Sequence, residues 1–496
     1  MSWFLGGIVF LAAGYFLYGR FVERLIGPDD RKTPCVANPD GVDYVPLPKW
    51  KNMLIQLLNI AGVGPVIGVI LGIKFGKVAL LIIPVGCVFM GAVHDFFSGM
   101  ISMRMNGANM PKMVSEHLGS KFAAVFTWIV MFALLLCVTV FANTPATLID
   151  RQWFPEVSVF WWSVGLIFAY YVAATLFPVD AIIGRIYPVF GALLVLGSIA
   201  VFVALVVAGF KDPAILADCP GFADYKAANP LFPCLFVTIA CGIISGFHAT
   251  QSPIVARTCR SEHEARATFY GMMIAEGVIA MIWASAALAI YNMAPENISL
   301  PGPVVLGNIA SSFLGKWMGG VTVAAIVVLA ITSGDTALRS SRLSLAEVIG
   351  VNQTRVKARI MTCLPLIAIV AALLWWSNRD AKSFGHLWNY FAWMNQLVST
   401  TMLFVATVWM FRRGRALGAL ATLIPGCFMC MVVSTFILWA WPSKGQVWGI
   451  VPGGLPLGVA AAVAAVLTAA VVAFLVRRGR IAPGNGPCVA CAGEKS

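Results

Sequence analysis

Long apolar stretches alternate with short polar connections along almost the whole chain. About thirteen of these stretches can cross a hydrocarbon core of about 30 Å, which takes roughly 20 helical residues each. They cover approximately residues 2–19, 52–74, 77–103, 122–144, 157–177, 185–209, 232–256, 268–291, 316–334, 357–376, 383–411, 414–440 and 454–476. Because unpaired backbone groups are costly in lipid, such segments form helices or a closed barrel, and these are too long and too uniformly apolar for barrel strands. The pattern predicts an all-α polytopic membrane protein with about thirteen transmembrane helices.

The charge content supports this class and gives an orientation. Of the 496 residues, 60% are hydrophobic and 11% are charged, whereas a soluble protein has roughly 25% charged residues. The net charge is +13, and about three quarters of the 34 Lys and Arg residues lie in the odd-numbered connections between segments. These residues indicate cytoplasmic loops rather than a nucleic-acid surface. We therefore expect the N-terminus outside and the C-terminus in the cytoplasm.

The first segment and the connections divide the chain into regions. Arg20 follows the first segment instead of preceding it, which is the reverse of a cleaved signal peptide and indicates an anchor helix. The predicted regions are an N-terminal anchor helix (1–19), a cytoplasmic connection (20–51), a first five-helix repeat (52–209), an extracytoplasmic loop (210–231), a second five-helix repeat (232–411), two accessory helices (412–476) and a cytoplasmic tail (477–496).

Two pairs of cysteines are placed by this topology. Cys219 and Cys234 lie at the two ends of the extracytoplasmic loop, where an oxidising compartment permits a disulfide, and the alternative is that Cys234 is already within the membrane. Cys488 and Cys491 form a CVAC pair in the tail. One such pair lacks two ligands for a tetrahedral zinc site, so we interpret these cysteines as free thiols.

Two segments are predicted to be broken helices. Ile60-Ala61-Gly62-Val63-Gly64-Pro65 lies in the middle of the second segment, and Cys241-Gly242-Ile243-Ile244-Ser245-Gly246-Phe247-His248 lies in the seventh. Proline lacks an amide donor, and glycine tolerates irregular dihedrals. The two segments are five apart and enter the membrane from opposite sides, which predicts inverted repeats with a site at the breaks. The alternative is ordinary helix packing through small residues.

A helix that breaks at the bilayer midplane exposes free amide and carbonyl groups. The amide end is partly positive and can hold a carboxylate, and the carbonyl end can hold a cation. A small anion such as a 2-oxo acid, or a short zwitterion such as a dipeptide, suits this arrangement without any lysine or arginine. The candidate substrate-binding residues are Ala61, Gly62, Gly64, Pro65, Ser245, Gly246, His248, Gln251 and Ser252.

Ionisable residues inside the predicted segments are few, and each is costly in lipid, at about 2.5–3.5 kcal/mol on insertion scales. The candidates for proton or sodium coupling are His94, Asp95, Glu276, Thr332, Ser333 and Asp335. Each has a structural alternative. Asp335 could pair with Arg339 four residues later near the cytoplasmic end of its helix, and His248 could be a satisfied core histidine. Asp95 and Glu276 could form buried hydrogen bonds to neighbouring helices.

The function class follows from these residues and from the motifs that the chain lacks. The histidines do not have HExxH spacing, and the sequence contains no GxSxG elbow and no P-loop. We therefore expect no enzyme, no metal and no cofactor, and we favour a secondary transporter. The alternatives are a membrane-embedded enzyme and a nutrient sensor with a transporter fold.

Several motifs taken together give a family resemblance over about residues 1–440. They are Asp40-Gly41-Val42-Asp43-Tyr44-Val45-Pro46, Ile60–Pro65, Gly91-Ala92-Val93-His94-Asp95-Phe96, Gly184-Arg185-Ile186-Tyr187-Pro188 and Ile239–His248. The chain resembles the carbon starvation protein (CstA) family of bacterial inner-membrane transporters. This resemblance implies a LeuT-like, amino acid–polyamine–cation type core of two inverted five-helix repeats. It also implies uptake of pyruvate or short peptides during carbon starvation, driven by protons. The chain differs from the larger members by a shorter C-terminal end and by His94 in place of an expected glutamine.

Overall fold

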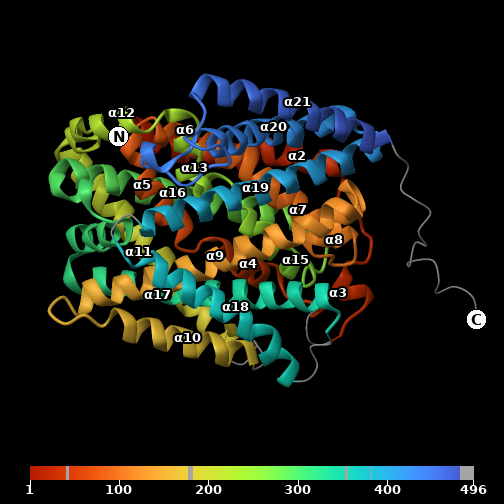
Figure 1. The fold of residues 1–496 in the computed structure, drawn as a ribbon, viewed down its shortest axis with the longest axis horizontal. Coiled ribbons are helices and arrows are strands. Elements are labelled where there is room, and N and C mark those ends of the chain that lie inside the picture. Colours follow the sequence, from red (N-terminus) through yellow and green to blue (C-terminus); the bar gives the residue numbers. More distant parts are fainter. Residues whose placement is uncertain (41–43, 177–182, 352–355, 381–382, 481–496) are drawn as a thin grey trace, which may run out of the picture.

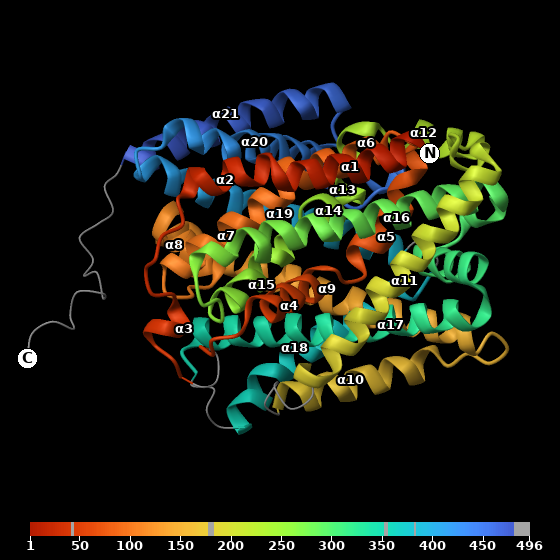
Figure 2. The same cartoon turned by 180° about the vertical axis from the view of Figure 1, so that it is seen from behind.

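The computed structural model describes residues 1–40, 44–176, 183–351, 356–380 and 383–480. The long helices run roughly parallel to one axis, with α20 and α21 at one edge of the bundle and α10 at the opposite edge (Figure 1). Seen from behind, α1 and α2 lie one after the other along the outside of the bundle (Figure 2). The Cys488 and Cys491 pair lies outside the described residues.

The helices of the first half begin and end at residues that the hydrophobic pattern largely anticipates. They are α1 (Ser2–Phe16), α2 (Tyr18–Ile26), α3 (Pro34–Ala37), α4 (Lys49–Ile60), α5 (Gly64–Gly72), η1 (Ile73–Phe75), α6 (Ala79–Gly86), η2 (Cys87–Gly91), α7 (Ala92–Arg104), α8 (Met110–Leu118), α9 (Ser120–Trp153), α10 (Phe160–Leu176) and α11 (Ile183–Lys211).

The second half continues with short helices in the loop after α11 and then with long ones. They are η4 (Pro213–Leu216), η5 (Pro220–Phe222), α12 (Ala223–Ala228), α13 (Leu231–Thr238), α14 (Ala240–Ile243), α15 (Gly246–Ala256), η6 (Glu262–Glu264), η7 (Arg266–Tyr270), α16 (Gly271–Met293), η8 (Pro295–Ser299), α17 (Gly302–Ile349), α18 (Val356–Ser377), α19 (Ser383–Arg412), α20 (Ala416–Trp439), η9 (Pro442–Lys444) and α21 (Leu457–Arg480).

The membrane class is confirmed by these helices. Within the described residues, 10 helices are long and apolar enough to cross a membrane, and the bent pair of α4 with α5 and η1 raises the number to 11. The other two predicted spans correspond to α10, whose apolar part is shorter, and to the interrupted run of α13, α14 and α15. The total of about thirteen spans stays a prediction.

Both predicted breaks are present. Ala61 to Val63 separate α4 from α5, and the two helices are bent by 48°. Pro65 occupies the first turn of α5, where its missing amide leaves no unsatisfied donor. In the second break, Ile244 and Ser245 are extended, and α15 begins at Gly246. The helices therefore end where the Gly–Pro and Ser–Gly patterns indicate.

The two breaks lie side by side because small residues let the half-helices approach closely. A methyl group placed on Gly64 would lie 2.7 Å from the Cβ of Cys241, and one on Gly68 would lie 3.0 Å from the carbonyl oxygen of Thr238. α5 therefore packs against α14, while α4 packs against α15. Close packing through small residues, offered above as an alternative to a broken-helix site, thus occurs together with the breaks.

Three expectations need correction. The ninth predicted span, 316–334, is part of a 48-residue α17 that continues to Ile349 and is interrupted only at Gly315, where φ is +71°. Asp335 therefore lies inside that helix and not at its end. Cys219 and Cys234 are free, buried thiols, so the disulfide that was considered as one of two alternatives is absent.

Candidate functional site

Four buried ionisable side chains form a continuous chain in the centre of the bundle. His94 Nδ1 lies 2.8 Å from Asp95 Oδ1, and Asp95 Oδ2 lies 3.0 Å from His248 Nδ1. The other ring nitrogen of His248 lies 3.5 Å from Glu276 Oε2. None of the four is more than 1% exposed. We call His94, Asp95, His248 and Glu276 the buried tetrad.

Three elements bring the tetrad together. His94 and Asp95 are in the first turn of α7, His248 is in the first turn of α15 directly after the second break, and Glu276 is on α16. The π-helical turn η2 immediately precedes α7, and such turns are frequent at functional sites. A methyl group on Gly91, at the end of η2, would lie 2.2 Å from the carbonyl oxygen of Ile243. This close approach places the start of α7 against the second break.

The tetrad contains two carboxyl groups and two imidazoles in a site without solvent exposure. If both carboxyl groups are ionised and His248 is protonated, one negative charge is unbalanced. An unbalanced charge inside a membrane costs about 2.5–3.5 kcal/mol on insertion scales. Neither carboxyl oxygen of Glu276 has a hydrogen-bond partner within the described part of the chain. Gain or loss of one proton therefore changes the energy of the buried site strongly.

Asn395 caps the second break, a role that we did not anticipate from the sequence. Its Oδ1 accepts the Phe247 N–H at 2.8 Å, and its Nδ2 donates to Ser245 Oγ at 2.9 Å and to Cys241 Sγ at 3.2 Å. Asn395 comes from α19 and is 3% exposed. The only signal for it in the sequence is an amide inside an apolar segment. The carboxamide thus occupies the amide end of α15, where we expected a substrate carboxylate.

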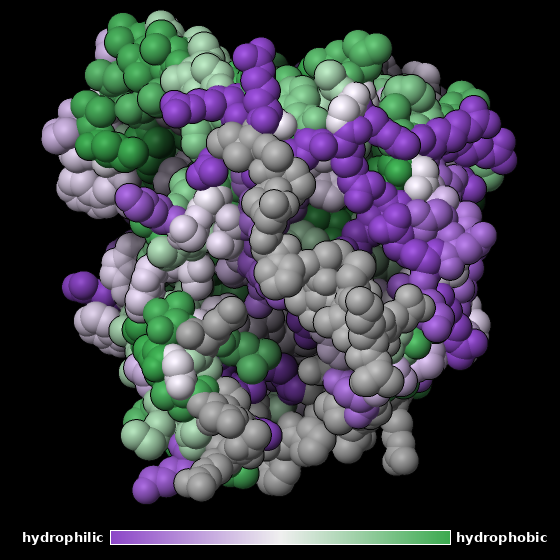
Figure 3. Space-filling view, turned by 90° about the vertical axis from the view of Figure 1, so that its right-hand side faces the viewer, coloured by the Kyte–Doolittle hydropathy of each residue, from purple (hydrophilic) through white to green (hydrophobic). Residues whose placement is uncertain are grey.

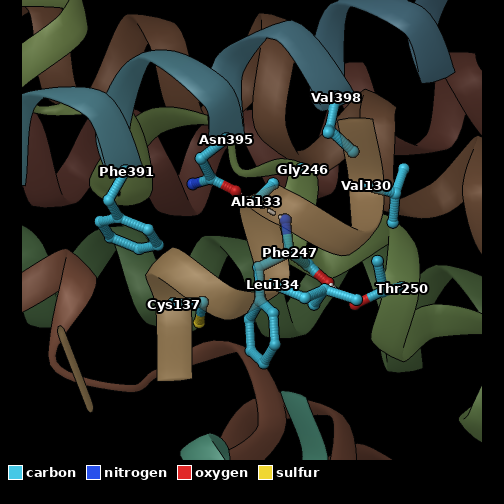
Figure 4. Close-up of a pocket in the computed structure, with 10 residues that line it drawn as sticks. All are labelled: Val130, Ala133, Leu134, Cys137, Gly246, Phe247, Thr250, Phe391, Asn395 and Val398. Carbon is cyan, nitrogen blue, oxygen red and sulfur yellow. Dashed lines mark hydrogen bonds between the residues drawn. The ribbon is translucent and has the colours of Figure 1, made fainter. Parts of the chain in front are cut away.

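A small cavity adjoins this cap (Figure 4). Its volume is about 10 Å³, which is room for roughly one water molecule. Its lining residues come from α9, α15 and α19, and they are Val130, Ala133, Leu134, Cys137, Gly246, Phe247, Thr250, Phe391, Asn395 and Val398. In Figure 4, the Asn395 side chain points from α19 towards Gly246 and Phe247. The amide end of α15 is therefore closed by protein atoms in this conformation.

The first break faces α17 through Ser333. A methyl group on Gly62 would lie 3.5 Å from Ser333 Oγ and 3.4 Å from the Phe141 ring. The Phe141 ring lies 6.0 Å from that of Phe247, so it stands between the two breaks. Ser333 Oγ is buried and has no hydrogen-bond partner among the described residues. The hydroxyl of Thr332 donates to the carbonyl of Leu329 in its own helix.

The remaining predicted site residues have local roles. Asp335 is fully buried, and its Oδ2 lies 3.8 Å from Arg339 Nη2, so the two form an ion pair, and neither carboxyl oxygen has a hydrogen bond to the described part of the chain. Ser252 donates to the carbonyl of His248 at 3.0 Å, and Gln251 Nε2 donates to Thr250 at 3.1 Å. None of these contacts joins Asp335, Ser252 or Gln251 to the tetrad side chains. Ala61 and Pro65 are buried at the first break.

A second ionic cluster closes one end of the bundle. Arg104, the last residue of α7, binds Glu262 of η6 through two contacts of 2.8 and 2.7 Å, and both side chains are nearly fully buried. Arg104 also donates to the carbonyl of Gly27, and Glu262 accepts the Asp29 N–H. Hydrogen bonds from Arg31 hold the pKa of Asp29 below its usual range. The connection after α2 is thereby fixed across the end of α7.

This end of the bundle carries many hydrophilic residues (Figure 3). Hydrophilic residues gather on it in the space-filling view, most densely on one side (Figure 3). The last turns of α19 and α21, which contain Arg412 and Arg477, Arg478 and Arg480, contribute to its positive charge. Such an excess of basic residues is typical of a cytoplasmic face.

Comparison with known proteins places these features in a family. The model of the family described as "Carbon starvation protein CstA" matches residues 1–164, 151–325 and 304–436. An uncharacterized membrane protein of Haemophilus influenzae is 42% identical over 342 residues, which cover 59% of this chain and 91% of the relative. The peptide transporter CstA of Bacillus subtilis is 27% identical over 537 residues, covering 88% of this chain and 89% of the relative.

Two more proteins resemble this chain, one in sequence and one in fold. The pyruvate/proton symporter BtsT of Escherichia coli is 29% identical over 337 residues, which cover 55% of this chain and 47% of the relative. A crystal structure of the manganese transporter of Eremococcus coleocola aligns with 89% of this chain and 98% of its own, at a TM-score of 0.55 and 12% identity. At this identity, the likeness shows a shared fold and nothing about the transported solute.

Proposed function

Because this chain belongs to the carbon starvation protein CstA family, we propose that it is a secondary transporter that imports pyruvate or a short peptide together with a proton. It acts in the response to carbon starvation and resides in the bacterial inner membrane. Relatives named as a peptide transporter and as a pyruvate/proton symporter support this substrate range. Like its relatives, the chain is a membrane transport protein and not an enzyme.

One observation carries the proposal. The buried tetrad includes His248 in the first turn of α15, directly after a helix break, so that a titratable site and free peptide groups lie within the same few residues. His248 joins the two, because its backbone belongs to the first turn of α15 and its ring contacts Asp95 and Glu276. A protonation change at the tetrad therefore acts on the helix end that meets the solute.

The substrate carboxylate binds at the amide end of α15. The positive end of a helix favours an anion by about 0.3–1 kcal/mol when exposed and by up to about 2 kcal/mol when partly buried. Ser245, Gly246 and the Phe247 N–H supply the donors, and the first break supplies the opposite wall through Ala61, Gly62, Gly64 and Pro65. Gln251 and Ser252 line the following turn of α15.

The proton binds at the tetrad, with His94, Asp95, His248 and Glu276 sharing it. The alternative coupling site would hold a sodium ion at Ser333, Thr332 and Asp335, because Ser333 Oγ lies beside the first break and has no partner among the residues that the structure describes. Hydroxyl and carboxylate oxygens of this kind suit a hard cation. Substrate uptake measured under a proton gradient alone and under a sodium gradient alone distinguishes the two sites.

The proposed architecture has about thirteen transmembrane helices around a LeuT-like core of two inverted repeats, 52–209 and 232–411. The antiparallel pairing of half-helices supports it, since α4 packs on α15 and α5 packs on α14. The anchor helix precedes the core, two accessory helices follow it, and the cytoplasmic connection 20–51, the extracytoplasmic loop 210–231 and the tail 477–496 complete the chain. The N-terminus lies outside and the C-terminus in the cytoplasm.

Uptake into proteoliposomes tests the function. Purified protein is reconstituted, and labelled pyruvate and labelled dipeptides are offered under an inward proton gradient, an inward sodium gradient, or neither. We expect accumulation of at least one substrate class with the proton gradient alone. Uptake of neither class under any gradient would refute the proposed substrates, and uptake that follows only sodium would move the coupling site to Ser333 and Asp335.

A further inference from the structure

A stripe of buried polar groups leaves the tetrad along one face of α7. His94, Ser98 and Ser102 follow each other at intervals of four residues, and all three are fully buried. Residues four apart lie on the same face of a helix, about 6 Å from one another along its axis. The stripe therefore extends about 12 Å from the tetrad towards the end of α7 that is closed by Arg104 and Glu262.

Several atoms of this stripe lack a partner. His94 Nε2 and Ser98 Oγ have no hydrogen-bond partner among the described residues. The same holds for Thr268 Oγ1, which is fully buried on η7. The element η7 packs against α7, and a methyl group on Gly99 would lie 2.4 Å from the Phe269 ring. Thr268 is the neighbour of Phe269 and therefore belongs to the element that packs against this part of α7.

These three buried polar atoms, on two elements that pack together, need an explanation. Each buried polar group without a partner costs about 1–3 kcal/mol. Water is the smallest ligand that can both donate to and accept from an imidazole nitrogen and two hydroxyls, and buried waters typically make about three such bonds. Ser102 terminates the stripe, because its hydroxyl donates to the carbonyl of Ala108 in the connection after α7 at 2.9 Å. The stripe thus joins the tetrad to a connection at the basic end of the bundle.

We propose that the His94–Ser98–Ser102 stripe, with Thr268 beside it, holds a file of water molecules through which the coupling proton leaves the tetrad for the cytoplasm. This inference rests on the proposed proton symport. His94 is the exit group, since its Nδ1 contacts Asp95 and its Nε2 is buried without a partner among the described residues. The imidazole accepts a proton at one nitrogen and releases another from the second nitrogen to the first water. One proton enters the tetrad from the outer side and one leaves it, so the tetrad returns to its starting charge.

The test separates proton release from substrate binding. Ser98→Ala and the control Ser285→Ala are reconstituted with a pH-sensitive dye inside the vesicles. Ser285 is also fully buried, and its hydroxyl has no partner within the described ranges, but it lies nine residues beyond Glu276 on the opposite face of α16. Two rates are measured: net substrate uptake with its proton influx, and exchange of labelled against unlabelled substrate at equal pH. During exchange, the carrier returns with its proton still bound, so no proton has to leave through the stripe.

We expect Ser98→Ala to lower net uptake and proton influx about tenfold or more, because proton transfer by a positioned group contributes factors of about 10²–10⁴. Exchange should stay within about twofold of the parent protein, and Ser285→Ala should change neither rate. Unchanged proton influx in Ser98→Ala, or equal losses of uptake and exchange, would overturn the exit path and leave the symport intact. Uptake by the parent protein without any proton influx would overturn both.

Discussion

Replacement of Asn395 tests how the amide end of α15, at the second break, becomes free for the substrate. In this conformation, the Asn395 carboxamide accepts the Phe247 N–H at 2.8 Å and contacts Ser245 and Cys241. If a substrate carboxylate binds the amide end of α15, it must take the Phe247 N–H from Asn395. The carboxamide and the substrate then compete for one donor. Asn395→Ala and Asn395→Asp should therefore change substrate affinity in opposite directions.

The magnitude follows from the bonds that are exchanged. A neutral hydrogen bond of this kind contributes about 1 kcal/mol net, so its removal in Asn395→Ala should lower the apparent KM roughly fivefold. Asn395→Asp places a carboxylate on the amide end, where helix-end and charge-assisted contacts favour it by up to about 2 kcal/mol. A substrate anion must overcome that gain and the repulsion between like charges. We expect the apparent KM of the Asn395→Asp variant for the substrate to rise by about tenfold or more.

The assay is initial-rate uptake over a range of substrate concentrations, with Ser399→Ala as the matched control. Ser399 is buried on the same helix one turn later, and its hydroxyl donates only within that helix, to the carbonyl of Gln396. The control should keep the parent KM within about twofold. A raised KM in Asn395→Ala would show that Asn395 binds the substrate directly. Equal loss of activity in both Asn395 variants without a change in KM would refute the competition.

Two further predictions concern stability, measured as thermal unfolding in detergent. Gly64→Val should destabilise the protein by about 1–3 kcal/mol, because even its Cβ would lie 2.7 Å from Cys241. The control Gly165→Ala should be neutral or stabilising by up to about 1 kcal/mol, because no described atom lies within 4 Å of the added methyl and alanine favours a helix interior. Equal melting temperatures for Gly64→Val and the parent protein would show that the breaks are not tightly packed. Glu262→Gln should lower the free energy of unfolding by about 3–5 kcal/mol, since it leaves the buried Arg104 without its counter-charge. A loss of stability below about 0.5 kcal/mol would mean that solvent reaches the pair.

The helix breaks could be predicted from the sequence because their causes are local. Pro65 and the glycines around it limit the backbone at the first break, and the Ser245-Gly246 pair marks the second. Hydropathy located the spans for a similar reason, since each helix must cover the same apolar thickness. The end of α17 was misjudged because Asp335 was taken as a helix terminus, whereas the helix continues to Ile349.

The site itself needed tertiary structure. His94 and Asp95 are neighbours in the sequence, but their contact with His248 depends on α7 packing against α15. Glu276 contacts His248 only because α16 passes close to the same part of α15. For Asn395 the sequence shows only an amide inside an apolar segment, and nothing around it in α19 indicates that it meets a helix end far away in the chain. Single-sequence reasoning therefore found the ionisable groups and missed the cap.

Replacement of Glu276 by glutamine tests the central claim, that the buried tetrad binds the coupling proton. The change keeps the size of the side chain and removes its titration, and the variant is compared with the parent protein in proteoliposomes under an imposed inward proton gradient. We predict that Glu276→Gln still exchanges labelled for unlabelled substrate but no longer accumulates it against a concentration gradient. Gradient-driven accumulation at the parent level would contradict the account, because the proton would then be bound elsewhere.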